Sequence, residues 1–138
     1  MAPEVIRRKL AFLRQVLDDL AHYRDATIDE IQANHYAVER MLELLVMTAT
    51  DLLLHFLAER NLQPDSYRAT FLLAAESNLL PHDLADRLAD AAGMRNVKVH
   101  MYESIDYTIL ADSVNPALDD FTDFVAVLAP LAEQHRDE

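Results

Sequence analysis

The chain has 138 residues, a formal net charge of −12 and no cysteine. This length fits a single domain, residues 1–138, because it suffices to bury a core but not to build two ordinary domains. The lack of cysteine excludes disulfides and thiolate zinc sites, and the negative charge argues against broad, non-specific adhesion to nucleic acid. With 51% hydrophobic residues and one glycine, the composition favours helices over sheets. We expect an all-α bundle of five or six helices.

The N-terminal sequence "MAPEVIRRKL" has neither the apolar core nor the cleavage site of a signal peptide. Residues 1–14 carry a net charge of +3, from Arg7, Arg8, Lys9 and Arg14 against Glu4. They form either a local basic face or a solvated helix surface.

The most apolar stretch, residues 41–58, is interrupted by Glu43, Asp51 and His55. This pattern favours a buried helix over a membrane span. Together with the absence of cysteine, it predicts a cytoplasmic protein.

The first two predicted helices occupy residues 4–24 and 27–61. In the first, leucines and isoleucine recur at spacings of three and four from Ile6 to Leu20, which indicates an amphipathic helix. In the second, Thr27 and Glu30 have the spacing of a capping box, and neither proline nor glycine follows before Asn61, so we expect one helix of over thirty residues.

The second half of the chain predicts four shorter helices. One begins after Asp65 or Ser66 and covers residues 67–78. The next has Pro81 in its first turn and ends at Gly93, the only glycine, because glycine is the usual residue after a helix end. A fifth helix then starts at residue 94, and Asn115 followed by Pro116 begins a sixth to about residue 134, leaving "QHRDE" as a frayed tail.

Several kinds of catalytic site are excluded by the sequence. A single glycine cannot form a phosphate-binding loop of the G-x-x-x-x-G-K type or a G-x-S-x-G nucleophile elbow. The six histidines show no H-x-x-x-H or H-E-x-x-H spacing, so no metal site is indicated. Asp51 and His55 are four residues apart, share one helical face and could pair, which favours a structural or supporting role over a metal site.

The stretch "RNVKVHMY" remains, with Arg95, Asn96, His100 and Tyr102. Arg95 offers a fixed cation with a planar fork of donors for phosphate oxygens. His100 can give or take a proton near neutral pH, since the ordinary histidine pKa is about 6.5. The same residues could also form a polar stripe beside the core, which the spacing alone does not distinguish from a site.

The segment "GMRNVKVHMYESID" resembles the signature of the HEPN superfamily, and in particular HepT-like proteins, the toxin partners of minimal nucleotidyltransferase antitoxins. The similarity extends to "NHYAVERMLELL", "TDLLLHFL", "YRATFLLAAESNLLPHDLADRLADAAG" and "LDDFTDF", and so to nearly the whole chain. One departure is Met47, where an acidic residue four positions before Asp51 is expected.

The resemblance implies an all-α homodimer that cleaves RNA, either transfer RNA or messenger RNA, without metal or cofactor through an R-x4-6-H pair. Arg95 and His100 would then be catalytic, and Asn96 the polar residue beside the arginine. Tyr102 would receive AMP from ATP through an MntA-like nucleotidyltransferase, which silences the nuclease. The alternative is an inactive helical dimer that serves as a binding module for such a nucleotidyltransferase.

The geometry of a helix adds a constraint to this site. At about 100° per residue, Arg95 and Tyr102 lie on nearly one line, Asn96 and His100 lie on another, and Arg95 and His100 are roughly 140° apart. Asn96 can therefore orient the His100 imidazole, and an adenylyl group on Tyr102 would block the phosphate site. To aim Arg95 and His100 at one phosphate, either Arg95 lies at an irregular helix start after Gly93 or two subunits share a cleft.

Overall fold

The structure, a computed structural model, describes residues 3–99 and 107–137, and of residues 94–99 and 134–137 it describes the backbone alone. All regular elements in this part of the chain are helices, which confirms the predicted all-α bundle. The six helices are α1 (Pro3–Ala21), α2 (Ile28–Ala33), α3 (His35–Ala58), α4 (Tyr67–Glu76), α5 (His82–Val99) and α6 (Tyr107–Asp137).

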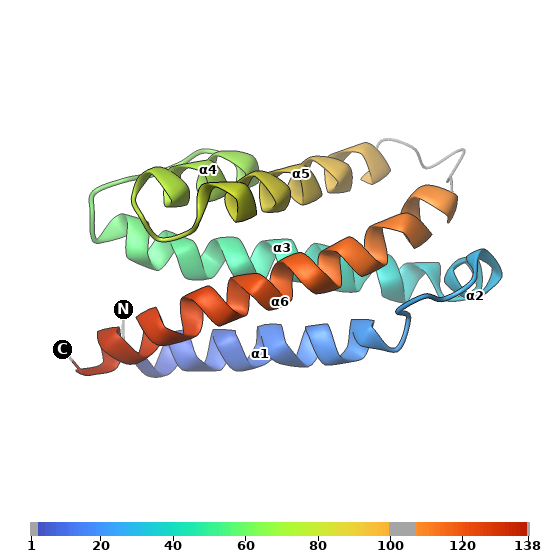
Figure 1. Cartoon of the computed structure of the whole chain (residues 1–138), viewed down its shortest axis with the longest axis horizontal. Helices are drawn as coiled ribbons and strands as arrows, with labels where there is room; N and C mark the ends of the chain where they lie inside the picture. The colour runs from blue at the N-terminus through green and yellow to red at the C-terminus, as the bar shows by residue number, and fades with distance from the viewer. Residues whose placement is uncertain (1–2, 100–106, 138) are drawn as a thin grey trace.

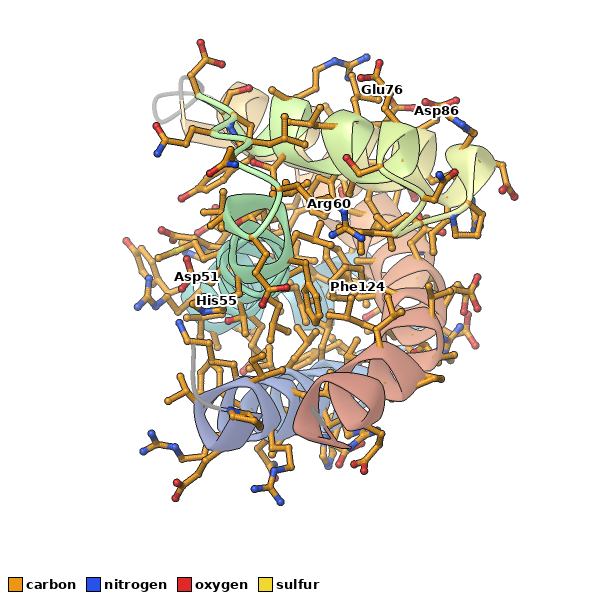
Figure 2. All side chains as sticks on the ribbon, turned by 90° about the vertical axis from the view of Figure 1, so that its left-hand side faces the viewer. Asp51, His55, Arg60, Glu76, Asp86 and Phe124 are labelled. Atoms are coloured by element: carbon orange, nitrogen blue, oxygen red, sulfur yellow. The ribbon has the colours of Figure 1, made fainter. Side chains whose placement is uncertain are left out.

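Helices α3 and α6 run through the middle of the bundle, with α1 along one side and the α4–α5 pair along the other (Figure 1). The view along the bundle shows the same layers, with α6 beside α3 (Figure 2). The end of α5, the start of α6 and the start of α3 lie at one end of the molecule, and the chain termini lie at the opposite end (Figure 1).

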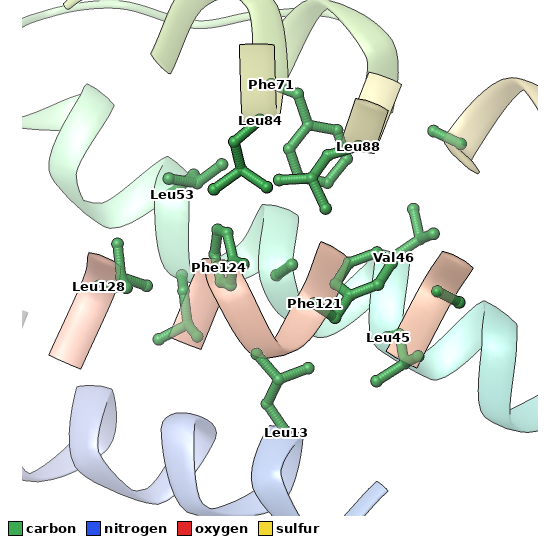
Figure 3. Close-up of a cluster of buried hydrophobic side chains, with 14 of the residues drawn as sticks. Leu13, Leu45, Val46, Leu53, Phe71, Leu84, Leu88, Phe121, Phe124 and Leu128 are labelled. Atoms are coloured by element: carbon green, nitrogen blue, oxygen red, sulfur yellow. The ribbon is translucent and has the colours of Figure 1, made fainter. Parts of the chain in front are cut away.

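The core forms where these layers meet, and large side chains from five helices fill it (Figure 3). Phe71 of α4 and Phe121 and Phe124 of α6 are at most 1% exposed, and truncating such a phenylalanine to alanine typically costs about 3–5 kcal/mol. Helix α3 is long and apolar enough to cross a membrane, yet 56% of its most apolar stretch is buried inside the bundle. The apolar composition of α3 is therefore explained by its position inside the bundle, as predicted for residues 41–58.

The predicted helix over residues 27–61 is wrong in its continuity, because the chain turns at Asn34 between α2 and α3. The predicted capping box is confirmed: the Thr27 side chain accepts a hydrogen bond from the Glu30 backbone N–H. Asn34 then donates from Nδ2 to the Glu30 carbonyl over 2.8 Å. This side-chain bond competes with the backbone bond that would continue the helix, so α2 ends here. Ile31 of α2 is buried.

Gly93 does not end a helix, contrary to the sequence prediction. Helix α5 continues to Val99 and Gly93 has no positive φ. In the described part of the chain, the left-handed residues are instead Asp25, Asn61 and Asn78, with φ between 59° and 63°, and each follows a helix end. Asparagine and aspartate tolerate this conformation better than other non-glycine residues, so this chain ends its helices without glycine.

Two predictions about the last helix are also wrong. Asn115 and Pro116 do not start a helix but lie inside α6, which continues past the predicted end near residue 134 to Asp137. A proline inside a helix removes one backbone hydrogen bond and costs about 3 kcal/mol. Burial of Val114, Leu118 and Phe121 around it offsets that cost, since each such side chain contributes about 1.5–3 kcal/mol.

Candidate functional site

The predicted site lies where α5 ends. Arg95 and Asn96 belong to the helical backbone of α5, whose last residue is Val99, and α6 begins at Tyr107. His100 and Tyr102 lie outside the described residues, so their roles and those of Arg95 and Asn96 stay predictions. One alternative can be decided: Arg95 does not lie at an irregular helix start, because α5 is continuous through Gly93.

An aromatic contact joins the start of α6 to the start of α3 at this end of the bundle. The ring centroids of Tyr107 and His35 are 5.4 Å apart with a tilt of 60°. His35 Nδ1 is also 3.3 Å from Glu39 Oε2. Tyr107, the other tyrosine close to the motif, is therefore half-buried against a neighbouring ring.

An ionic contact braces α5 against α6. Arg87 donates from Nη1 to Asp120 Oδ1 over 2.6 Å, and Asp83 and Asp123 lie 3.9 and 3.6 Å from the same guanidinium. Asp120 is only 8% exposed. Burial raises the pKa of this carboxyl above its ordinary value, while the Arg87 charge and hydrogen bond oppose that rise. Arg87 lies two turns before Arg95 on α5, so the contact fixes the helix that carries the motif arginine.

A second contact holds α6 against the turn after α1. Asp25 donates its backbone N–H to Asn115 Oδ1 over 3.1 Å, and Asn115 Nδ2 donates to Asp25 Oδ1 over 2.7 Å. Arg24 adds an ion pair of 2.8 Å to Asp119. These roles of Asp120, Asp119 and Asn115 are not among those predicted from the sequence. The available signal was the adjacent pair of acids in "LDDFTDF", which places one carboxylate on the apolar face of the helix.

Asp51 and His55 both lie on the side of α3 that points away from Phe124 (Figure 2). Asp51 accepts a 3.2 Å ion pair from Lys9 of α1, and His55 Nε2 is buried without a hydrogen-bond partner. Burial and the nearby Lys9 charge lower the pKa of His55. Asp51 therefore pairs with Lys9, while its proposed support of the site stays a prediction. Within the described ranges, no three His, Asp or Glu side chains are grouped as a metal site requires.

The basic N-terminal residues occupy the exposed side of α1. Arg7, Arg8 and Arg14 are exposed, whereas Lys9 is half-buried and paired. This stretch lies near the chain termini, at the opposite end of the bundle from the end of α5 (Figure 1). Within one chain, these arginines therefore lie far from the end of α5.

Residues 6–128 match the sequence profile of the family described as "Ribonuclease HepT-like". The chain belongs to the HepT-like family. An "mRNA nuclease HepT" from Shewanella oneidensis is 30% identical over 126 residues, which cover 89% of this chain and 90% of the relative. A "tRNA nuclease HepT" from Aphanizomenon flos-aquae is 26% identical over 128 residues, covering 89% and 86%.

Two solved structures have the same fold as this chain. A tri-AMPylated HEPN toxin from Shewanella oneidensis, in complex with MNT antitoxin, matches with a TM-score of 0.79 and 25% identity over 91% of this chain and 97% of that toxin. A cytosolic protein from Bacillus subtilis, YutE, matches with a TM-score of 0.78 and 18% identity over 96% and 91%, a likeness of fold. The resemblance found in the sequence is thus confirmed at the level of family and fold.

Proposed function

We propose that this protein is an endoribonuclease toxin that cleaves messenger RNA or transfer RNA through Arg95 and His100. The observation that carries the proposal is the presence of "RNVKVHMY" inside the 6–128 match to the HepT-like ribonuclease family. Two relatives that this chain matches over 90% and 86% of their own length are named nucleases of these two RNA classes. We expect the protein to act in the cytoplasm, where both RNAs are available.

The proposed chemistry needs no metal ion. A base takes the proton of the ribose 2′-hydroxyl, the 2′-oxygen attacks phosphorus, and an acid protonates the departing 5′-oxygen, leaving a 2′,3′-cyclic phosphate. His100 can serve as base or acid because neutral and protonated imidazole coexist near pH 7. Arg95 neutralises the charge that develops on the phosphate oxygens, and Asn96 orients the imidazole.

We further propose that the active species is a homodimer. One imidazole cannot be both base and acid in the same step, whereas a two-fold dimer brings two histidines and two arginines to one cleft. The continuity of α5 through Gly93 supports this arrangement. Of the two arrangements expected from the sequence, the shared cleft is the one that a continuous α5 leaves in place, and it is the one we propose.

The test is RNA cleavage by the purified protein in the presence of EDTA. His100→Ala is expected to lower the rate by about 10²–10⁴, the usual contribution of general acid–base catalysis. His82→Ala, at the exposed start of α5, is the matched control and should cleave at the parental rate. Circular dichroism shows whether each variant is folded. A folded His100→Ala variant that cleaves as fast as the parent would refute the assignment.

Regulation by adenylylation at Tyr102 is the second part of the proposal. The tyrosine oxygen attacks the α-phosphorus of ATP, pyrophosphate leaves, and the negative adenylyl group then competes for the arginine cations. The solved complex of a tri-AMPylated HEPN toxin with MNT antitoxin supports this proposal. An MntA-like nucleotidyltransferase with ATP is expected to add adenylate mass to the parent and to Tyr107→Phe, and none to Tyr102→Phe. Unchanged labelling of Tyr102→Phe would contradict it.

The alternative function is an inactive helical dimer that binds a nucleotidyltransferase. The net charge of −12 favours it, as do Asp83, Asp86 and Asp90, which are exposed along α5. RNA binding distinguishes the two functions. If the protein is a nuclease, the His100→Ala variant should bind a fluorescent RNA when it is titrated into that RNA at low salt. A variant that binds the nucleotidyltransferase but does not bind RNA would favour the inactive binding module.

A further inference from the structure

Helix α3 carries a line of outward-facing residues with a repeat of three and four. Tyr36 is 80% exposed and Leu54 is 37% exposed. Between them, Arg40 and Glu43 form a 3.5 Å ion pair on the surface, and Met47 is half-buried. Residues at this spacing lie on one face of a helix, and a repeat of this kind is typical of helices that pack against another helix.

This line lies on the side of α3 that the other described helices leave open. Helices α1, α4, α5 and α6 all contact α3. Figure 2 shows Phe124 on one side of α3 and Asp51 and His55 on the other, and Asp51 pairs with Lys9 of α1, so α1 borders this side. Large exposed apolar side chains mark interaction surfaces more often than an exposed polar helix does.

The charges on the line are complementary to a second copy of themselves. If two α3 helices cross in antiparallel directions about a two-fold axis midway between Arg40 and Glu43, each Arg40 faces Glu43 of the partner subunit. Tyr36 lies four residues before Arg40, and Met47 lies four residues after Glu43. The same axis therefore sets each Tyr36 ring over Met47 of the partner subunit, a favourable contact of sulfur with an aromatic ring.

The position of this axis along α3 also suits a shared catalytic site. The contact of His35 with Tyr107 places the start of α3 beside the start of α6. At a rise of about 1.5 Å per residue, His35 is roughly 10 Å from the axis along the helix, so the two His35 residues are roughly 20 Å apart in that direction. An axis at Leu54 would separate them by about 57 Å. Of these two axes, the first therefore brings the ends of the two molecules that carry the end of α5 closer together (Figure 1).

We propose that a second copy of this chain docks on the α3 line (Tyr36, Arg40, Glu43 and Met47), with reciprocal Arg40–Glu43 pairs about the two-fold axis. The proposal specifies the partner surface of the dimer and rests on the proposed shared site. It is independent of the identity of the catalytic residues, because the assembly is measured as a mass.

Charge reversal tests the reciprocal pairs. Arg40→Glu puts two glutamates opposite each other, and Glu43→Arg puts two arginines opposite each other, so each variant should dimerise at least about 100-fold more weakly than the parent. Light scattering after size exclusion is expected to give twice the 15.7 kDa chain for the parent and a monomer for each variant at the same concentration. Arg14→Glu and Glu4→Arg make the same charge changes on the exposed face of α1 and should stay dimeric.

Mixing the two variants separates this contact from the pair within one chain. In an equimolar mixture, the introduced glutamate of one variant faces the introduced arginine of the other, so a heterodimer should form. Repair of the ion pair within a chain cannot produce this result. Two monomeric variants that stay monomeric when mixed, single variants as dimeric as the parent, or a monomeric parent would each overturn the docking mode. A failure of the nuclease assignment would appear instead as unchanged RNA cleavage by His100→Ala, with the dimer mass unaffected.

Discussion

Replacing Arg87 by methionine removes the cation that braces α5 against α6 and leaves Asp120 buried. The methionine keeps much of the side-chain volume and loses a 2.6 Å hydrogen bond to a carboxylate that is 8% exposed. A hydrogen bond to a charged group contributes about 1.5–3 kcal/mol, and because the Arg87 side chain is 45% exposed, solvent screening favours the lower half of that range. We expect a loss of about 2 kcal/mol at pH 7.5.

The pH dependence of this loss follows from the Asp120 pKa. Burial raises the pKa of Asp120 above its ordinary value of 3.8, and Arg87 opposes that rise. A raised carboxyl pKa means that the folded state holds the proton more tightly, so its stabilising contribution is present below pH 3.8 and is lost as pH rises through the folded-state pKa. Without Arg87 the pKa rises further. The deficit of Arg87→Met relative to the parent should therefore shrink on acidification from pH 7.5 to about 4.5.

Thermal unfolding followed by circular dichroism measures this effect. For 138 residues, at about 2.1 cal/mol/K per residue, 2 kcal/mol corresponds to a Tm lower by roughly 7 °C at pH 7.5. The double variant Arg87→Met/Asp120→Asn removes both charges and should recover much of the loss, since an unpaired buried charge costs more than the absent pair contributes. A deficit of equal size at both pH values, or a double variant as unstable as the single one, would refute the reasoning.

Three further changes test other parts of the fold. Gly93→Ala should raise Tm by roughly 3 °C, because alanine is favoured over glycine inside a helix by about 1 kcal/mol and its Cβ meets no heavy atom within 4 Å; a lower Tm would contradict the continuity of α5. Asn115→Ala should cost about 1 kcal/mol in urea unfolding by removing both hydrogen bonds to Asp25, and an unchanged midpoint would rule out that contact. Because the pKa of His55 is lowered from 6.5 by burial and Lys9, its contribution to stability is present above pH 6.5 and is lost as pH falls below it. His55→Gln should therefore be less sensitive than the parent to acidification from pH 7 to 5, and parallel pH profiles would count against it.

The helices themselves could be predicted from periodicity, because their apolar residues recur at helical spacing wherever a helix buries one face. Thr27 caps α2 as predicted, and of the two predicted caps for α4, Asp65 and Ser66, the structure uses Ser66. The helix ends were harder to predict than the helices themselves. Glycine is the usual stop signal, but this chain uses left-handed Asp25, Asn61 and Asn78 instead. Nothing in the local sequence distinguishes these residues from Asn115, which lies inside a helix.

The tertiary contacts explain the remaining differences. Pro116 lies inside α6 because the apolar face of that helix is buried on both sides of it, and this burial depends on residues distant in sequence. Arg95, Asn96, His100 and Tyr102 could be proposed as site residues from their spacing and the family resemblance. The chemistry proposed for them depends on the type of each side chain, which the sequence states directly. The Arg87–Asp120 brace could not be predicted, because its partners are 33 residues apart and sequence spacing does not show which distant residues meet.

The central claim is that His100 and Arg95 cleave RNA, and one measurement tests it most directly. Purified parent protein, His100→Ala and His82→Ala are each incubated with single-stranded RNA in EDTA, and the 3′ ends of the products are identified. We predict cyclic phosphate ends at matching rates for the parent and His82→Ala, and a rate at least about 100-fold lower for His100→Ala. Equal cleavage by a folded His100→Ala variant, or no cleavage by the unmodified parent, would contradict the claim.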